Sequence, residues 1–144
     1  MITKEDQAVA QALRDLVTKM TRRLRKQISN PGALSIAERN VVGILMNQQD
    51  AFPSELGSQL SLSSQFMSQI LNRLEGLDYI TRRSSPDDRR KTLISLTKKG
   101  RRMVENSRQE REEWLATVIS AQYNSREKKL IKEALALLSV IPEL

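Results

Sequence analysis

The sequence contains no cysteine and no histidine, and aromatic residues make up only 3% of its 144 residues. Without cysteine, the chain cannot form disulfides, thiolate metal sites or a cysteine-based oxidant sensor. Without histidine as well, it lacks the usual nucleophile–base pairs and most ligands for transition metals. We therefore expect that the protein is not an enzyme and that it uses no metal and no other cofactor.

Long apolar runs are also missing, because charged residues interrupt every stretch that could reach the roughly 18 residues needed to cross a membrane. Residues 1–12 include Glu5 and Asp6 and lack the apolar block of a secretory signal. These absences predict a soluble, cytoplasmic protein. A length of 144 residues fits one domain, so we expect residues 1–144 to form a single one.

Charge of one sign is in excess, since 24 Lys and Arg residues against 17 Asp and Glu residues give a formal net charge of +7. Such a balance favours a polyanionic partner, either a nucleic acid or an anionic membrane surface. Charge alone does not choose between these two partners.

Apolar residues spaced by three and four predict a long amphipathic helix from about Lys4 to Ile28. Asn30-Pro31-Gly32 then breaks the helical pattern. Ser35 and Glu38 form a capping-box pattern that predicts the start of a second helix.

Two shorter helices and a hairpin are expected in the middle of the chain. A third helix opens at Pro53, and a fourth covers about residues 63–77, so that the pair forms a helix-turn-helix candidate. Strand-like segments at 79–83 and 92–96 enclose a polar segment at 84–91, which predicts a β-hairpin.

Two helices complete the chain: a fifth capped by Thr97, and a sixth that starts at Asn124 after a break at Gln122-Tyr123. The fold class expected is mainly α, an α+β winged helix-turn-helix of about six helices with a small hairpin.

The fourth helix has a polar outer face when Met67 and Leu71 point inward. Glutamine and asparagine can bond adenine in the major groove, and arginine can bond guanine or a phosphate. The residues of this helix that we expect to contact DNA are Ser63, Ser64, Gln65, Ser68, Gln69, Asn72 and Arg73. Two plainer interpretations stay open: any surface helix is polar outside, and Ser63 could be only a helix cap.

The hairpin gathers positive charge from Arg82 and Arg83 as well as from its loop, where we expect Arg89, Arg90 and Lys91 to contact DNA. An arginine at the tip could enter the minor groove, whose potential is negative in A·T-rich DNA. An acid two positions earlier, here Asp88, could brace that arginine by an ion pair. The alternative is a solvated polar loop.

The segment from Asp88 to Gly100 resembles the signature of the multiple antibiotic resistance regulator (MarR) family, in which D-x-R is followed at fixed spacing by L-T-x-x-G. The resemblance implies a winged helix-turn-helix between terminal helices that intertwine two subunits. It also implies that Arg90 enters the minor groove, braced by Asp88, and that the fourth helix faces the major groove. At Asp78 the family usually has a glycine in a left-handed conformation; aspartate tolerates this conformation better than most residues.

Apolar stripes on the terminal helices predict a homodimer, because a chain this short covers them most easily with a second copy. The residues expected at the dimer interface are Leu13, Leu16, Val17, Met20, Trp114, Val118, Leu135, Leu138 and Ile141. Within the single domain, residues 35–96 would form the DNA-binding lobe, and residues 1–30 and 97–144 the dimerisation region.

The function that the sequence favours is a sequence-specific, DNA-binding transcriptional regulator. As the resemblance implies, it would repress transcription from a pseudo-palindromic operator, with possible relief by a small anionic or aromatic effector. The alternative is a winged-helix architectural or protein-interaction module that does not read DNA sequence.

Overall fold

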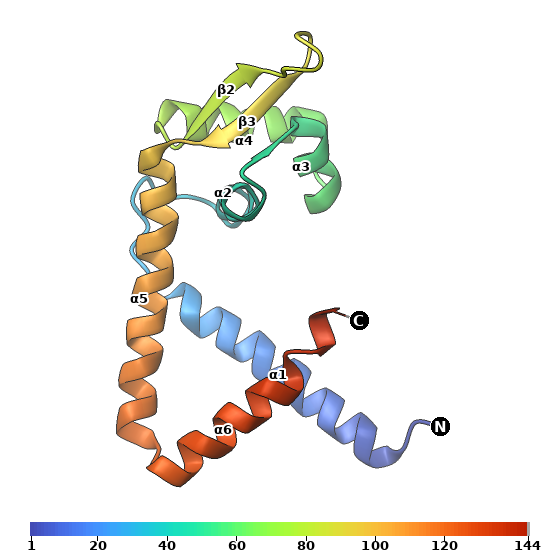
Figure 1. Ribbon diagram of the computed structural model, residues 1–144, viewed down its shortest axis with the longest axis vertical. Helices are drawn as coiled ribbons and strands as arrows, with labels where there is room; N and C mark the ends of the chain where they lie inside the picture. Colours follow the sequence, from blue (N-terminus) through green and yellow to red (C-terminus); the bar gives the residue numbers. More distant parts are fainter. Residues whose placement is uncertain (144) are drawn as a thin grey trace. The chain divides into compact units, whose positions relative to one another are not determined.

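The computed structural model describes residues 1–143, which are mainly helical and carry a small antiparallel sheet (Figure 1). The helices are α1 (Lys4–Arg25), α2 (Ile36–Gln48), α3 (Pro53–Leu60), α4 (Ser64–Gly76), α5 (Lys98–Gln122) and α6 (Ser125–Leu138), followed by the 3-10 helix η1 (Ile141–Glu143). The strands are β1 (Asp50–Ala51), β2 (Ile80–Ser84) and β3 (Thr92–Leu96), in the order β1-β3-β2. The predicted fold class is confirmed. Within residues 1–143, no helix has the length and apolar character needed to cross a membrane.

Side-chain caps fix where several helices begin. Ser35 and Glu38 form the predicted capping box at α2, and Asn124 and Glu127 form another at α6. The corresponding box at α1, from Thr3 and Asp6, was not predicted. In each box a side-chain oxygen accepts a backbone N–H that the first helical turn leaves unpaired.

The observed elements differ from the predicted ones at a few ends. Helix α1 ends at Arg25 instead of Ile28, and β2 begins at Ile80 instead of Tyr79. Strand β1 was not predicted, because two residues are too few to show the alternation that marks a strand. It pairs with β3 through Asp50–Ser95 and Ala51–Ile94.

The chain divides into two compact units, which we call the winged unit (Ser29–Arg108) and the terminal unit (Met1–Ile28 with Gln109–Leu144). The winged unit is wider than the DNA-binding lobe expected at residues 35–96, since it includes the loop before α2 and the first part of α5. The single domain that the sequence predicts stays a prediction.

A hydrophobic core fills the winged unit and holds α4 against the sheet. Its buried apolar residues are Leu34, Val41, Val42, Leu45, Ala51, Leu56, Met67, Ile70, Leu71, Leu74, Tyr79, Ile80, Leu93, Ile94, Leu96 and Val104. Helix α4 contributes four of these residues at helical spacing, so its opposite face is left to solvent.

The turn after α4 is left-handed at Asp78, whose φ is +61°. The Tyr79 N–H donates to the carbonyl of Leu74 at 3.0 Å, and the Asp78 N–H donates to that of Glu75 at 2.9 Å. These bonds form the Schellman ending that a glycine most often allows. The expectation that aspartate takes the place of glycine here is confirmed.

The start of α5 docks on this turn through Thr97 and Gly100. The Thr97 hydroxyl donates to the carbonyl of Asp78 at 2.6 Å, and the Thr97 N–H donates to the carbonyl of Tyr79 at 3.0 Å. Gly100 packs directly on Tyr79, because a Cβ at Gly100 would overlap the Tyr79 carbonyl oxygen and lie 2.9 Å from its carbonyl carbon. The L-T-x-x-G pattern therefore has a structural role in the winged unit.

In the terminal unit, neither α1 nor α6 has a buried residue. Among the residues predicted at a dimer interface, the exposed ones are Leu16, Val17, Met20, Leu135 and Ile141, and the half-exposed ones are Leu13, Trp114, Val118 and Leu138. An open, mostly apolar cleft of about 680 Å³ lies between α1 and the residues Leu138 and Ile141. The apolar surface of this unit thus lacks a cover within the described residues.

We predict that Gly100→Ala lowers the free energy of unfolding by about 2–3 kcal/mol, because the added methyl forces the α5 start away from Tyr79. Urea denaturation at fixed protein concentration measures the change. The control is Gly43→Ala in the interior of α2, where an added Cβ meets nothing within 4 Å. That control should gain about 0.5–1 kcal/mol, since alanine restricts the unfolded chain and favours helix. Equal stability of the two variants would contradict the docking role of Gly100.

Candidate nucleic-acid interface

The exposed face of α4 carries uncharged polar side chains. Gln65, Ser68, Gln69 and Asn72 are all exposed, opposite the buried Met67 side. Within residues 1–143, the side chains of Gln65, Ser68 and Gln69 make no hydrogen bond to the protein, so they are available to a ligand. These side chains are short or medium donors and acceptors, which suit base edges in a major groove.

The start of α4 is capped by Ser63, whose hydroxyl accepts the Phe66 N–H at 3.1 Å. Ser63 therefore acts as the N-cap of α4. Ser64 follows as the first helical residue and is exposed. A contact from either serine to a phosphate stays a prediction.

Arg73 turns back from α4 onto the loop that precedes α2. It forms an ion pair with Glu38, and its Nη2 donates to the carbonyls of Gly32 at 2.7 Å and Ala33 at 3.3 Å. Helical phase placed Arg73 on the DNA-facing side, because phase ignores the reach of a long side chain. Its guanidinium is occupied by protein acceptors here, so a base contact from Arg73 stays an untested prediction.

Glu38 is the buried partner of this pair, with a side chain only 7% exposed. Burial opposes its ionisation, but hydrogen bonds from Arg73 and from the Ser35 N–H, together with the charge of Arg73, outweigh it and lower the pKa of Glu38 below its usual value. The carboxylate thus joins the α2 capping box to the side of α4.

Asn72 and Glu75 on α4 are both held by Arg82 of β2. Nη2 of Arg82 donates to Oδ1 of Asn72 at 2.7 Å, and Nε lies 3.3 Å from a carboxylate oxygen of Glu75. From the sequence, Arg82 was predicted only to add positive charge near the hairpin. The signal that could have found its role is strand alternation, since β2 turns Arg82 inward between exposed Thr81 and Arg83.

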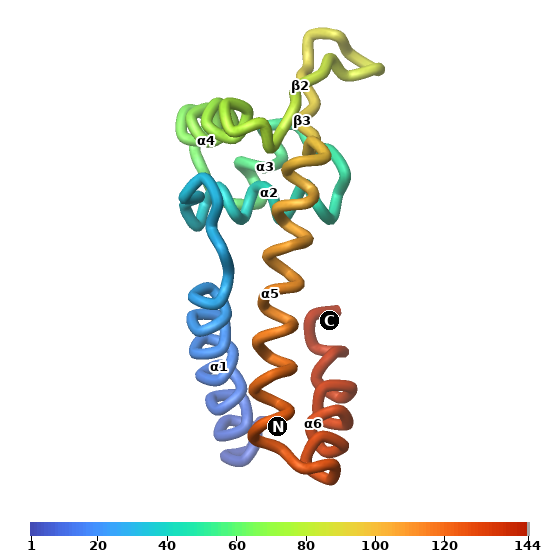
Figure 2. Tube along the Cα trace, turned by 90° about the vertical axis from the view of Figure 1, so that its left-hand side faces the viewer, coloured from blue at the N-terminus to red at the C-terminus, as the bar shows by residue number. Residues whose placement is uncertain are grey.

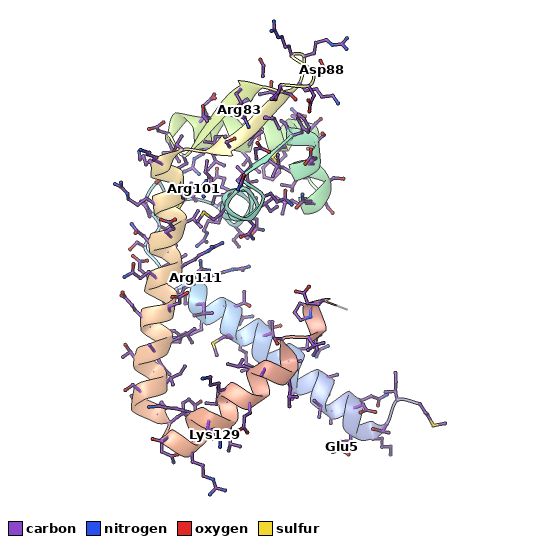
Figure 3. All side chains as sticks on the ribbon, in the orientation of Figure 1. Glu5, Arg83, Asp88, Arg101, Arg111 and Lys129 are labelled. Carbon is purple, nitrogen blue, oxygen red and sulfur yellow. The ribbon has the colours of Figure 1, made fainter. Side chains whose placement is uncertain are left out.

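The loop that joins β2 and β3 projects away from the helices of the winged unit, as Figures 1 and 2 show. It is closed by the Ser85 N–H, which donates to the Lys91 carbonyl at 2.8 Å, and by the Lys91 N–H, which donates to the Asp88 carbonyl at 2.9 Å. Asp88 lies in this loop (Figure 3).

The ion pair expected between Asp88 and Arg90 is present. A carboxylate oxygen of Asp88 accepts the Arg90 backbone N–H at 3.0 Å and its Nε at 3.3 Å. The Arg90 side chain is nevertheless 92% exposed, so the brace leaves most of the guanidinium free. Arg89 is exposed as well. Their contacts to DNA stay predictions.

Two further contacts fix the base of the hairpin. Nη2 of Arg83 lies 2.7 Å from a carboxylate oxygen of Asp50 in β1, and Nζ of Lys91 lies 5.6 Å from the centre of the Phe52 ring. Figure 3 shows Arg83 on its strand. Lys91, expected to contact DNA, therefore also anchors the loop to the segment before α3.

This arrangement of α3, α4 and a β-hairpin is a winged helix-turn-helix, and the sequence model of the MarR family matches residues 34–91. The same architecture occurs in a putative transcriptional regulator from Pseudomonas aeruginosa, which is 29% identical, with 99% of each chain covered and a TM-score of 0.81. The resemblance to the MarR family is thus confirmed in sequence and in fold.

Two protein relatives are named as HTH-type transcriptional regulators. The HTH-type regulator Mb0904 of Mycobacterium bovis is 26% identical over 130 residues, which cover 90% of this chain and 89% of that protein. The HTH-type regulator YdgJ of Bacillus subtilis is 27% identical over 103 residues, which cover 72% of this chain and 62% of that protein.

Two more MarR-like folds come from solved structures. The regulator Tm0710 of Thermotoga maritima shares 22% identity and a TM-score of 0.83, with 95% of this chain and 96% of that chain covered. A mutant of Staphylococcus aureus MepR, described as bound to an oligodeoxyribonucleotide, shares 21% identity and a TM-score of 0.71, with 92% and 97% covered. These similarities show a transcriptional regulator that binds DNA.

We predict that Glu38→Gln lowers the stability of the protein at neutral pH by about 1–3 kcal/mol, because Arg73 loses its charged acceptor. Since folding lowers the pKa of Glu38, its contribution is complete above the unfolded value of 4.5 and is lost as the pH falls through the folded pKa. Urea unfolding of both proteins from pH 7 to pH 3 measures this. The two stabilities should converge at the acid end; a constant difference across the range would contradict the prediction.

Proposed function

We propose that the protein is a homodimeric repressor that binds a pseudo-palindromic operator, with α4 in the major groove and the loop of the hairpin at the minor groove. The observation that carries the proposal is the pairing of two surfaces in the winged unit. One is the face of α4 with free Gln65, Ser68 and Gln69, and the other is the exposed Arg90 held by Asp88. In a winged helix, one helix is expected to contact the bases, and an arginine of the wing is expected to contact the DNA backbone at the minor groove.

We expect a second copy of the chain to cover the exposed apolar surface of the terminal unit. Helix α1 has 22 residues and none is buried, while Leu16 and Val17 are each 56% exposed. Monomeric proteins rarely leave apolar surface of this extent in water, and a two-fold partner covers it with the same residues. The dimer would present two α4 helices to half-sites about 34–36 Å apart.

The MepR structure supports the DNA partner, because its fold is shared over 92% of this chain and it holds an oligodeoxyribonucleotide. We place the protein in the cytoplasm, where it reaches the operator. A small anionic or aromatic effector that relieves repression ~100-fold would need to favour the non-binding state by ~2.7 kcal/mol. Repression itself follows when the bound dimer occupies a promoter.

Selection of bound duplexes from random DNA should yield a pseudo-palindromic motif with two half-sites about one helical turn apart. Sedimentation equilibrium of the selected duplex with the protein should give two chains per duplex. Binding without preference among duplexes would reject sequence-specific regulation in favour of an architectural role. One chain per duplex would reject the dimer.

We predict that Arg90→Ala weakens operator binding by about 1–3 kcal/mol and leaves dimerisation intact, because Arg90 is exposed and packs on no core residue. Fluorescence anisotropy at several salt concentrations should also show a smaller dependence of affinity on salt. The matched control, Lys128→Ala, removes the same charge from α6 of the terminal unit. If both variants lose affinity equally, the effect is one of net charge, and the assignment of Arg90 is wrong.

A further inference from the structure

We propose that Arg82 determines base preference without touching DNA: it holds the amide oxygen of Asn72, so that Asn72 offers only its amino group and reads guanine. The inference rests on the proposed function, in which α4 lies in the major groove. It assigns to Arg82 a positioning role and to Asn72 a direction of hydrogen bonding.

The position of Asn72 on α4 makes it a candidate reader. At 100° per residue, Asn72 lies within about 30° of the line opposite the mean direction of the four buried residues of α4, as Gln65 and Gln69 also do. Asn72 is exposed on this outer face. A side chain on this face contacts any partner that binds α4.

The contact with Arg82 fixes which way the amide of Asn72 points. Arginine has hydrogen-bond donors and no acceptor, so the atom 2.7 Å from its Nη2 must be the amide oxygen. The Nδ2 amino group then faces away from Arg82, and it has no hydrogen-bond partner within the described residues 1–143. Asn72 is therefore presented as a donor.

Contacts within the winged unit restrain the Arg82 side chain that binds this amide. Its side chain is 31% exposed, β2 places it opposite Ile94 of β3, and the Glu75 carboxylate lies 3.3 Å from its Nε. Glu75 is the only acid in α4, so the same ion pair also offsets the one charge on the helix that would repel DNA. The guanidinium joins β2 to two successive turns of α4.

The hydrogen-bonding groups in the major groove determine which base suits an Asn72 amide in this orientation. Adenine is read bidentately by an amide that donates to N7 and accepts from N6, which uses the oxygen that Arg82 already occupies with a charged donor. Guanine offers two acceptors, N7 and O6, and asks only for a donor. The amino group of Asn72 matches guanine, and release of its oxygen would restore the match to adenine.

The test compares selected motifs from the wild-type protein, Arg82→Ala, Asn72→Ala and the double variant, all as full-length chains. We expect one G·C pair in each wild-type half-site to lose its preference in Asn72→Ala. In Arg82→Ala the same pair should shift toward A·T, with a change in the G·C to A·T affinity ratio of roughly tenfold. The double variant should match Asn72→Ala at that pair, since Arg82 acts only through Asn72.

Two controls separate orientation from charge and from folding. Glu75→Gln removes the charge of the ion pair but keeps an acceptor oxygen beside Arg82 and leaves the Arg82–Asn72 hydrogen bond, so the base preference should stay unchanged. Arg83→Ala removes the same type of side chain one residue along β2 and should also leave it unchanged. Arg82→Met keeps much of the aliphatic side chain but has no hydrogen-bond donor for Asn72, so it should give the same shift if Arg82→Ala does not fold.

Four results would overturn the proposal, each at a different point. An unchanged motif in foldable Arg82 variants, with one position altered in Asn72→Ala, overturns the role of Arg82. Adenine at the wild-type position of Asn72 overturns the donor orientation. An unchanged motif in Asn72→Ala removes Asn72 from base reading. A wild-type protein that selects no motif overturns the proposed function together with this inference, which distinguishes that failure from the others.

Discussion

The contact of Gly100 with the backbone of Tyr79 is the constraint on which the winged unit depends. Three elements meet near it: α4 ends at Gly76, three residues before Tyr79, β2 begins at Ile80, and the first turn of α5 packs on Tyr79 through Gly100. The arrangement needs a left-handed residue, which Asp78 supplies, and a residue without a side chain, which only glycine is. Thr97 closes it by donating to the carbonyl of Asp78 while accepting the Gly100 N–H at 3.0 Å. The direction of α4 relative to the hairpin follows from these few backbone contacts.

Arginines near the interface serve mainly to position other groups. Arg73 is bound to Glu38, Arg82 to Asn72 and Glu75, and Arg83 to Asp50. Each of these pairs joins two elements that are separate in the sequence. Their charges still contribute to the long-range attraction of DNA, but each of these arginines already uses part of its guanidinium to bind protein acceptors. A count of basic residues therefore overestimates the number of direct contacts with DNA. It also misses the role of these residues in positioning α4 and the hairpin.

Local signals account for what the sequence could predict. The capping box at Ser35 needs only residues three apart, so it could be predicted from a short segment. The left-handed turn at Asp78, in contrast, was expected from the resemblance to the MarR family. The Arg73–Glu38 pair spans 35 residues, and the Arg82–Asn72 bond spans 10, across a turn. No periodicity carries such information, because it depends on where folded elements meet. Helical phase indicated the exposed face of α4 but could not tell a free side chain from one already bound to a neighbour.

Affinity and specificity then come from different residues of the same chain. A net charge of +7 attracts any duplex, and this attraction weakens with salt without reading sequence. Discrimination requires groups whose hydrogen-bonding direction is fixed before DNA arrives, since a freely rotating amide accepts several bases nearly equally. Gln65 and Gln69 have no such restraint in the described residues, whereas Asn72 does. The restrained amide of Asn72 should therefore show the sharpest preference for one base. The unrestrained glutamines should accept different bases, depending on how the operator's shape and the contact of Asn72 position α4.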